Sequence, residues 1–144
     1  MHLLQVLGTL RALYMLHQAN HWQSSGPNYY GDHQLFERLY TPIPEEIDSV
    51  AERAVGLGAG AQVYAAQQSR VTDAILQRWA HSAPQGPAAT VRAMVSLAAE
   101  LDLLEQLDEA LSVQGVSNGV QNLLQGIADK HESNVYLLQQ RLGE

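Results

Sequence analysis

Two helical segments and the break between them are encoded by residues 21–53, whose sequence is HWQSSGPNYYGDHQLFERLYTPIPEEIDSVAER. Residues 26–28, Gly-Pro-Asn, are a turn signal, so a helix that begins near the N-terminus should end close to Ser24. Residues 29–40 then show apolar side chains at helical spacing, which predicts a second helical segment.

A proline-containing break, residues 41–44 (Thr-Pro-Ile-Pro), interrupts the second segment. Proline fits the first turn of a helix, where the backbone N–H groups lack intrahelical partners in any case. Both prolines are therefore tolerated if Thr41 is the N-cap of a restarted helix. Glu45 and Glu46 would then lie near the positive end of its dipole.

Helical periodicity continues outward from this stretch in both directions. The first helix carries an apolar stripe, and the restarted helix should point five side chains inward: Ile47, Val50, Ala51, Ala54 and Leu57. Further helices are expected at residues 61–81, 89–112 and 117–142, with a loop at 82–87. No alternating strand pattern occurs. The sequence predicts an all-α fold, a ferritin-like antiparallel four-helix bundle with a short extra connecting helix, in a single domain covering residues 1–144.

The charge balance disfavours nucleic acid as a partner. The chain has 15 Asp and Glu against 8 Lys and Arg, a formal net charge of −7. Binding a phosphate backbone requires clustered basic side chains. The absence of cysteine excludes disulfides and thiolate metal sites. No apolar run is long enough for a membrane span, and a cytoplasmic location is the default expectation.

Five side chains that can bind metal ions fall within the opening stretch: His21, His33, Glu37, Asp48 and Glu52. His33 and Glu37 are spaced i, i+4, and so are Asp48 and Glu52. Each pair therefore lies on one helix face. Imidazole with carboxylate suits iron, manganese or zinc, and a set this rich in carboxylates favours iron.

The positions of these pairs predict a site between subunits. His33–Glu37 and Asp48–Glu52 both lie on the flanks of their helices, away from the core stripes. Glu37 and Asp48 are 11 positions apart, about 16 Å along one helix. Metal ligands lie within about 2–2.6 Å of the ion. A two-fold axis would set His33 and Glu37 of one chain against Asp48 and Glu52 of a second copy. A sharp bend at residues 42–44 is the alternative.

The spacing resembles that of Dps proteins, the ferritin-like mini-ferritins of starved bacteria. The resemblance rests on His21-Trp22, Gly26-Pro27, His33, Glu37 and the stretch Asp48 to Arg53, and residues 121–142 look like that family's last helix. It covers most of the first 60 residues and the final 25. The resemblance implies a hollow dodecameric shell with di-iron ferroxidase sites at the dimer interfaces.

By the same likeness, His21, His33 and Glu37 come from one chain and Asp48 and Glu52 from its neighbour. Fe(II) would be oxidised, with hydrogen peroxide or oxygen as oxidant, and the ferric product stored. Trp22 resembles the tryptophan beside the family's metal site, which is a candidate sink for oxidising equivalents. The chain departs from the family in lacking a basic N-terminal arm, so DNA binding is not expected.

Other interpretations remain open at the level of sequence. One is a manganese- or iron-dependent peroxide scavenger without storage, and another is a structural bundle with a vestigial or zinc-filled site. His17 and His131 also fall on core-facing stripes and could form an alternative intrachain site with Glu100 or Asp129.

Overall fold

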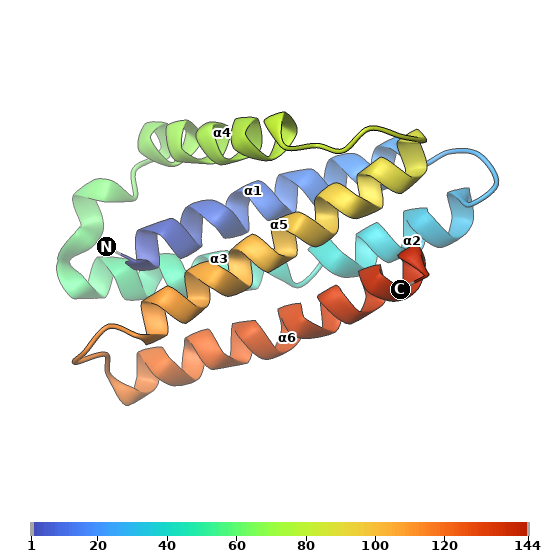
Figure 1. Ribbon diagram of the computed structural model, residues 1–144. Helices are drawn as coiled ribbons and strands as arrows, with labels where there is room; N and C mark the ends of the chain where they lie inside the picture. Colours follow the sequence, from blue (N-terminus) through green and yellow to red (C-terminus); the bar gives the residue numbers. More distant parts are fainter. Residues whose placement is uncertain (1, 144) are drawn as a thin grey trace.

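The computed structural model describes residues 2–143, and its regular structure there is entirely helical. The helices are α1 (His2–Gln23), α2 (Tyr29–Tyr40), α3 (Ile43–Ala54), α4 (Ala65–His81), α5 (Ala88–Leu111) and α6 (Asn118–Leu142) (Figure 1). The all-α prediction is confirmed.

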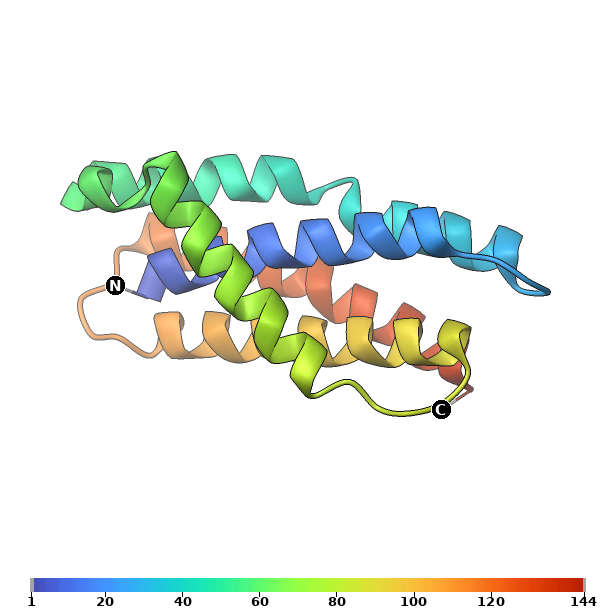
Figure 2. The same ribbon diagram turned by 90° about the horizontal axis from the view of Figure 1, so that it is seen from above.

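Helix α1, the α2–α3 pair, α5 and α6 form the bundle, and α4 lies outside it and crosses α1 obliquely (Figure 2). Helix α1 is central, because it contacts α2, α3, α4 and α5. The four-helix bundle is therefore confirmed. The extra connecting helix is α4, whose 17 residues make it shorter than α1, α5 and α6 with 22, 24 and 25 residues.

The main core lies around α1. Its fully buried side chains include Leu10 and Leu13 of α1, Leu103 and Leu107 of α5, and Leu124 of α6. Where α4 crosses α1, a Cβ atom at Gly8 would lie 2.6 Å from Val71 Cγ1. Glycine is therefore required for the close approach of the two helices.

The proline break differs from the expectation at Thr41. This residue has helical backbone angles and ends α2, and its hydroxyl donates to the Glu37 carbonyl at 2.6 Å. Pro42 takes the position before α3, with Pro44 in the first turn. The prediction that Thr41 is an N-cap was wrong, because its side chain is engaged by the preceding helix. The helix does resume after the break, as expected.

The end of α3 also differs from the expectation. The chain leaves the α-helix through a π-turn at Val55–Ala59 and a 3-10 turn at Gly60–Gln62, with Gly58 at φ 97°. This change of direction turns Leu57 outward, and its side chain is 59% exposed. Its predicted inward position was wrong.

None of the helices between residues 2 and 143 combines the length and apolar character needed to cross a membrane.

Candidate metal centre

His21 and His33 form a stacked pair beside the turn that joins α1 to α2. Their ring centroids are 3.7 Å apart, with an interplanar angle of 19°. Nδ1 of His21 donates to the His33 carbonyl at 2.6 Å, and Nδ1 of His33 donates to the His21 carbonyl at 2.9 Å. A carbonyl oxygen can only accept, so Nδ1 of each ring must carry the proton. In the neutral rings, both Nε2 atoms therefore present a lone pair, as metal ligands require.

The turn between the helices produces this pairing. Gly26 adopts φ 81°, its carbonyl accepts from the Tyr29 amide at 3.0 Å, and the Ser24 hydroxyl donates to the Asn20 carbonyl at 2.8 Å. The tight reversal sets the last turn of α1 beside the first turns of α2. The two rings are thus held by backbone groups before any ligand arrives.

Aromatic side chains surround the histidine pair. Tyr29 stacks on His33 at 5.0 Å, and Tyr40 meets His21 edge-on at 5.5 Å. Burial and the nearby Glu37 carboxylate raise the pKa of Tyr40, so its phenol stays protonated. Trp22 points outward and is 68% exposed, so it does not pack in this chain's own core.

The three carboxylates of the predicted set lie outside the core. Glu37, Asp48 and Glu52 are all exposed, whereas His21 is buried and His33 is half-buried. The break at residues 41–42 does not bring the two half-sites together, since no three His, Asp or Glu side chains within residues 2–143 are grouped so that they could hold one metal ion. The two predicted half-sites are therefore separate within one chain.

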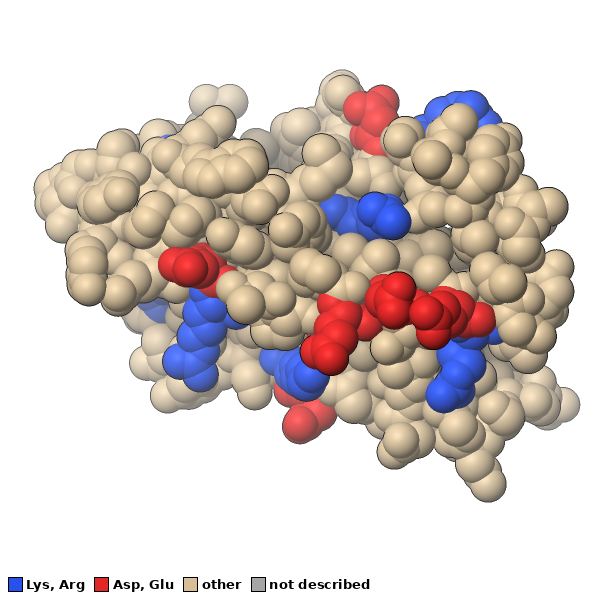
Figure 3. Space-filling model, turned by 180° about the vertical axis from the view of Figure 1, so that it is seen from behind, with Lys and Arg blue, Asp and Glu red and all other residues tan. Residues whose placement is uncertain are grey.

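The face opposite to that of Figure 1 mixes charges of both signs. Figure 3 shows acidic side chains in a row across its middle with single basic side chains around them, rather than a broad basic patch. This face offers no continuous surface for a phosphate backbone.

A second polar cluster lies in the centre of the bundle. His131 of α6 bridges two carboxylates: its Nδ1 lies 2.6 Å from Glu100 Oε2 and its Nε2 lies 2.7 Å from Glu46 Oε1. His17 Nε2 lies 2.9 Å from Glu100 Oε1, and all four side chains are buried. Of the residues considered for an alternative intrachain site, His17, His131 and Glu100 lie together, whereas Asp129 is exposed and takes no part.

The electrostatics of the cluster favour a proton held on His131. Burial alone would lower the pKa of His131, but hydrogen bonds with Glu100 and Glu46 raise it to about 9. Burial would raise the pKa of Glu100, but hydrogen bonds with His131 and His17 lower it to about 2. His131 is thus a buried imidazolium between two carboxylates. Because its two nitrogens point in opposite directions, the side chains do not converge on one point.

Sequence reasoning missed the burial of Glu46 and placed it only as a carboxylate in the first turn of the helix. Its spacing from Ile43 and Val50, both buried, puts it on the core-facing stripe of α3. The signal was therefore present in the periodicity.

The architecture defines the class: the chain is a ferritin-like helical bundle. Its fold is that of solved Dps structures. It matches Dps from Thermosynechococcus elongatus with a TM-score of 0.80 at 18% identity, covering 99% of this chain and 88% of that one. It matches a mutant of Dps1 from Mycobacterium smegmatis with a TM-score of 0.78 at 19% identity, and the match covers 98% of this chain and 92% of that one. It matches Dps from Microbacterium arborescens, solved in a high iron form, with a TM-score of 0.77 at 19% identity. This match covers 99% of this chain and 91% of that one.

Sequence comparison finds shorter similarities. A DNA protection during starvation protein of Brevibacillus brevis is 45% identical over 38 residues, which is 26% of this chain and 26% of that protein. An uncharacterized protein of Haemophilus influenzae is 36% identical over 54 residues, 38% of this chain and 34% of that protein. The matched stretches thus span about a quarter to a third of these relatives' length. No protein-family profile matches the chain.

Proposed function

We propose that this protein binds Fe(II), oxidises it at sites shared between two subunits, and retains the ferric product. The observation that carries the proposal is the reciprocal bonding of His21 and His33, which leaves both Nε2 atoms free beside each other on a preformed surface. Hydrogen bonds from one ring nitrogen to a backbone carbonyl commonly orient histidines whose other nitrogen binds a metal.

Each chain supplies two complementary halves of a site. His21, His33 and Glu37 form the imidazole-containing half, and Asp48 and Glu52 of a second copy supply the other carboxylates. A two-fold axis makes two such sites per dimer. Two points support this arrangement. No metal-binding group of three such side chains forms within residues 2–143, and neither half alone has the carboxylates that a di-iron site in a bundle uses.

The proposed reaction uses iron as substrate. Each of two Fe(II) ions gives one electron, and hydrogen peroxide accepts both, takes up two protons and is reduced to water. Because the two electrons come together from paired irons, no hydroxyl radical is released. Oxygen is the alternative oxidant, and manganese or zinc could occupy the same ligands. Exposed Trp22, next to His21, is proposed as a redox neighbour that takes stray oxidising equivalents.

The comparisons support iron as the metal and a closed oligomer as the assembly. The similar Dps structure from Microbacterium arborescens is of a high iron form. We propose self-association into a homodimer and then a dodecameric shell. The net charge of −7 argues against DNA as a ligand.

Anaerobic titration with Fe(II), followed by peroxide, tests the proposal. Saturable oxidation is expected, and His33→Ala and Asp48→Ala should each lower it by about tenfold or more. His81→Ala and Asp129→Ala are matched controls, because neither side chain is buried and both lie outside the proposed site. Normal oxidation by His33→Ala would refute the site.

Gel filtration after oxidation separates storage from scavenging. Ferric iron that elutes with the large assembly indicates storage, whereas loss of iron with retained peroxide consumption indicates a scavenger. Bound zinc without redox turnover would identify a structural bundle.

A further inference from the structure

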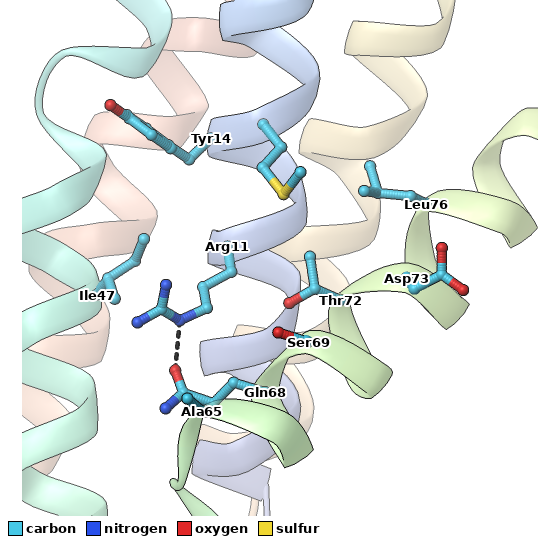
Figure 4. Close-up of a pocket in the computed structure, with 10 residues that line it drawn as sticks. Arg11, Tyr14, Ile47, Ala65, Gln68, Ser69, Thr72, Asp73 and Leu76 are labelled. Atoms are coloured by element: carbon cyan, nitrogen blue, oxygen red, sulfur yellow. Dashed lines mark hydrogen bonds between the residues drawn. The ribbon is translucent and has the colours of Figure 1, made fainter.

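A pocket outside the metal centre lies between α1, α3 and α4. Its volume is about 340 Å³, and it is lined by polar side chains of α4 on one wall and by Tyr14 and Ile47 on the other (Figure 4). This volume falls at the lower end of the range for small-molecule sites.

One cation in the pocket is held in a fixed orientation. Arg11 of α1 donates its Nε–H to the Gln68 side-chain oxygen, and the Gln68 amide nitrogen donates to the Val63 carbonyl. The Gln68 side chain is thus braced by the backbone, and in turn braces the guanidinium. Within residues 2–143, Arg11 forms no salt bridge. Its terminal N–H groups are therefore available to a ligand.

A buried hydroxyl without a partner faces the same pocket. Thr72 of α4 is only 6% exposed, and its Oγ1 has no hydrogen-bond partner among the described residues. A helical threonine commonly bonds the carbonyl four residues earlier, but this one does not. Figure 4 shows the hydroxyls of Thr72 and of Ser69, one turn earlier, pointing to the side on which Arg11 lies.

We propose that this pocket binds a small tetrahedral oxyanion, with inorganic phosphate as the representative ligand. A guanidinium and two hydroxyls are donors that match phosphate oxygens, and the apolar wall at Tyr14 and Ile47 strengthens their interaction with the anion. Asp73 also lines the pocket, but its carboxylate lies away from Arg11 (Figure 4).

The proposal is independent of the iron chemistry, since none of these side chains belongs to the metal half-sites. The pocket borders the surface that the proposed dimer would cover, because Ile47 precedes Asp48 on α3. Binding is therefore measured on the assembled, iron-free protein.

Calorimetric titration of the full chain with inorganic phosphate at low ionic strength tests the site. Saturable binding is expected, and Arg11→Met should weaken it by about tenfold or more through loss of a charge-assisted pair of hydrogen bonds. Arg70→Met is the matched control. Arg70 lies on α4, bonds Tyr64 and Gln67, and does not line the pocket, so phosphate binding should not change.

Thr72→Val separates binding from folding. It removes only the unpartnered hydroxyl, so the thermal midpoint should be kept or raised while phosphate binding weakens several-fold. A parallel titration with glycerol phosphate distinguishes a phosphomonoester from the free ion, and tighter binding of either assigns the ligand within the same class. Absence of saturable binding, equal displacement by chloride, or wild-type affinity in Arg11→Met would overturn the proposal.

Discussion

Mixing two inactive variants should restore iron oxidation, because the proposed site takes its two halves from different chains. His33→Ala damages the imidazole half, and Asp48→Ala damages the carboxylate half. Each variant alone has one damaged half in every site, so oxidation should fall by about tenfold or more. In a hybrid dimer, one of the two sites receives both of its halves undamaged.

The expected recovery follows from the symmetry. In a random one-to-one mixture, half of the sites receive an intact imidazole half, and half of those receive an intact carboxylate half. About a quarter of the sites should therefore be intact, whatever the size of the assembly. The two chains can be co-expressed at equal levels, purified together without selection of hybrids, and assayed for Fe(II) oxidation by peroxide at equal protein concentration.

A second mixture controls for effects other than complementation. His33→Ala and Glu37→Ala damage the same half, so every site in their hybrid remains damaged, and no recovery is expected. A site within one chain would give no recovery in either mixture. That outcome, with both variants folded and assembled, would refute the intersubunit geometry.

Three further predictions concern the scaffold. The pairing of His131 adds stability below pH 6.5 that is lost as the pH rises toward about 9, and that of Glu100 adds stability above pH 4.5 that is lost as the pH falls toward about 2. The free energy of unfolding in urea should therefore be highest between about pH 4.5 and pH 6.5. It should fall by an amount on the order of 3 kcal/mol by pH 9. A pH-independent unfolding free energy would contradict the buried imidazolium. Gly8→Ala should destabilise by about 1–3 kcal/mol in thermal unfolding because its methyl would collide with α4, whereas Gly31→Ala, which meets open space, should not. Ser117→Ala should cost about 1 kcal/mol through loss of the N-cap bond of α6, and an unchanged thermal midpoint would show that the cap contributes nothing.

The helices were predictable because their apolar periodicity and turn signals agree with each other. The end of α1 at Gln23, one residue before the predicted end at Ser24, follows from the turn at Gly26. The errors arose where tertiary context decided the conformation. Leu57 carries the right spacing for the core, but the turn through Gly58 takes it out of the helix.

The placement of the predicted ligands on helix flanks could be read from the sequence, but the detail of their surroundings could not. Spacing alone placed Glu37 and Asp48 on helix flanks, and neither side chain is buried in the structure. The mutual backbone bonds of His21 and His33 depend on the distance between two helices, which no local pattern encodes. The roles of these residues as iron ligands stay a prediction until they are measured.

The chain of side chains from Glu46 through His131 and Glu100 to His17 constrains how this sequence can change over generations. These residues come from α3, α6, α5 and α1, so each helix supplies one member. Replacing His131 alone by an apolar residue would leave two carboxylates buried without a cation, and replacing either carboxylate alone would unbalance the rest. Single substitutions are therefore blocked, and the members are expected to be inherited or lost together. Descendants of this chain should show the four positions covarying, while the apolar positions around them drift independently.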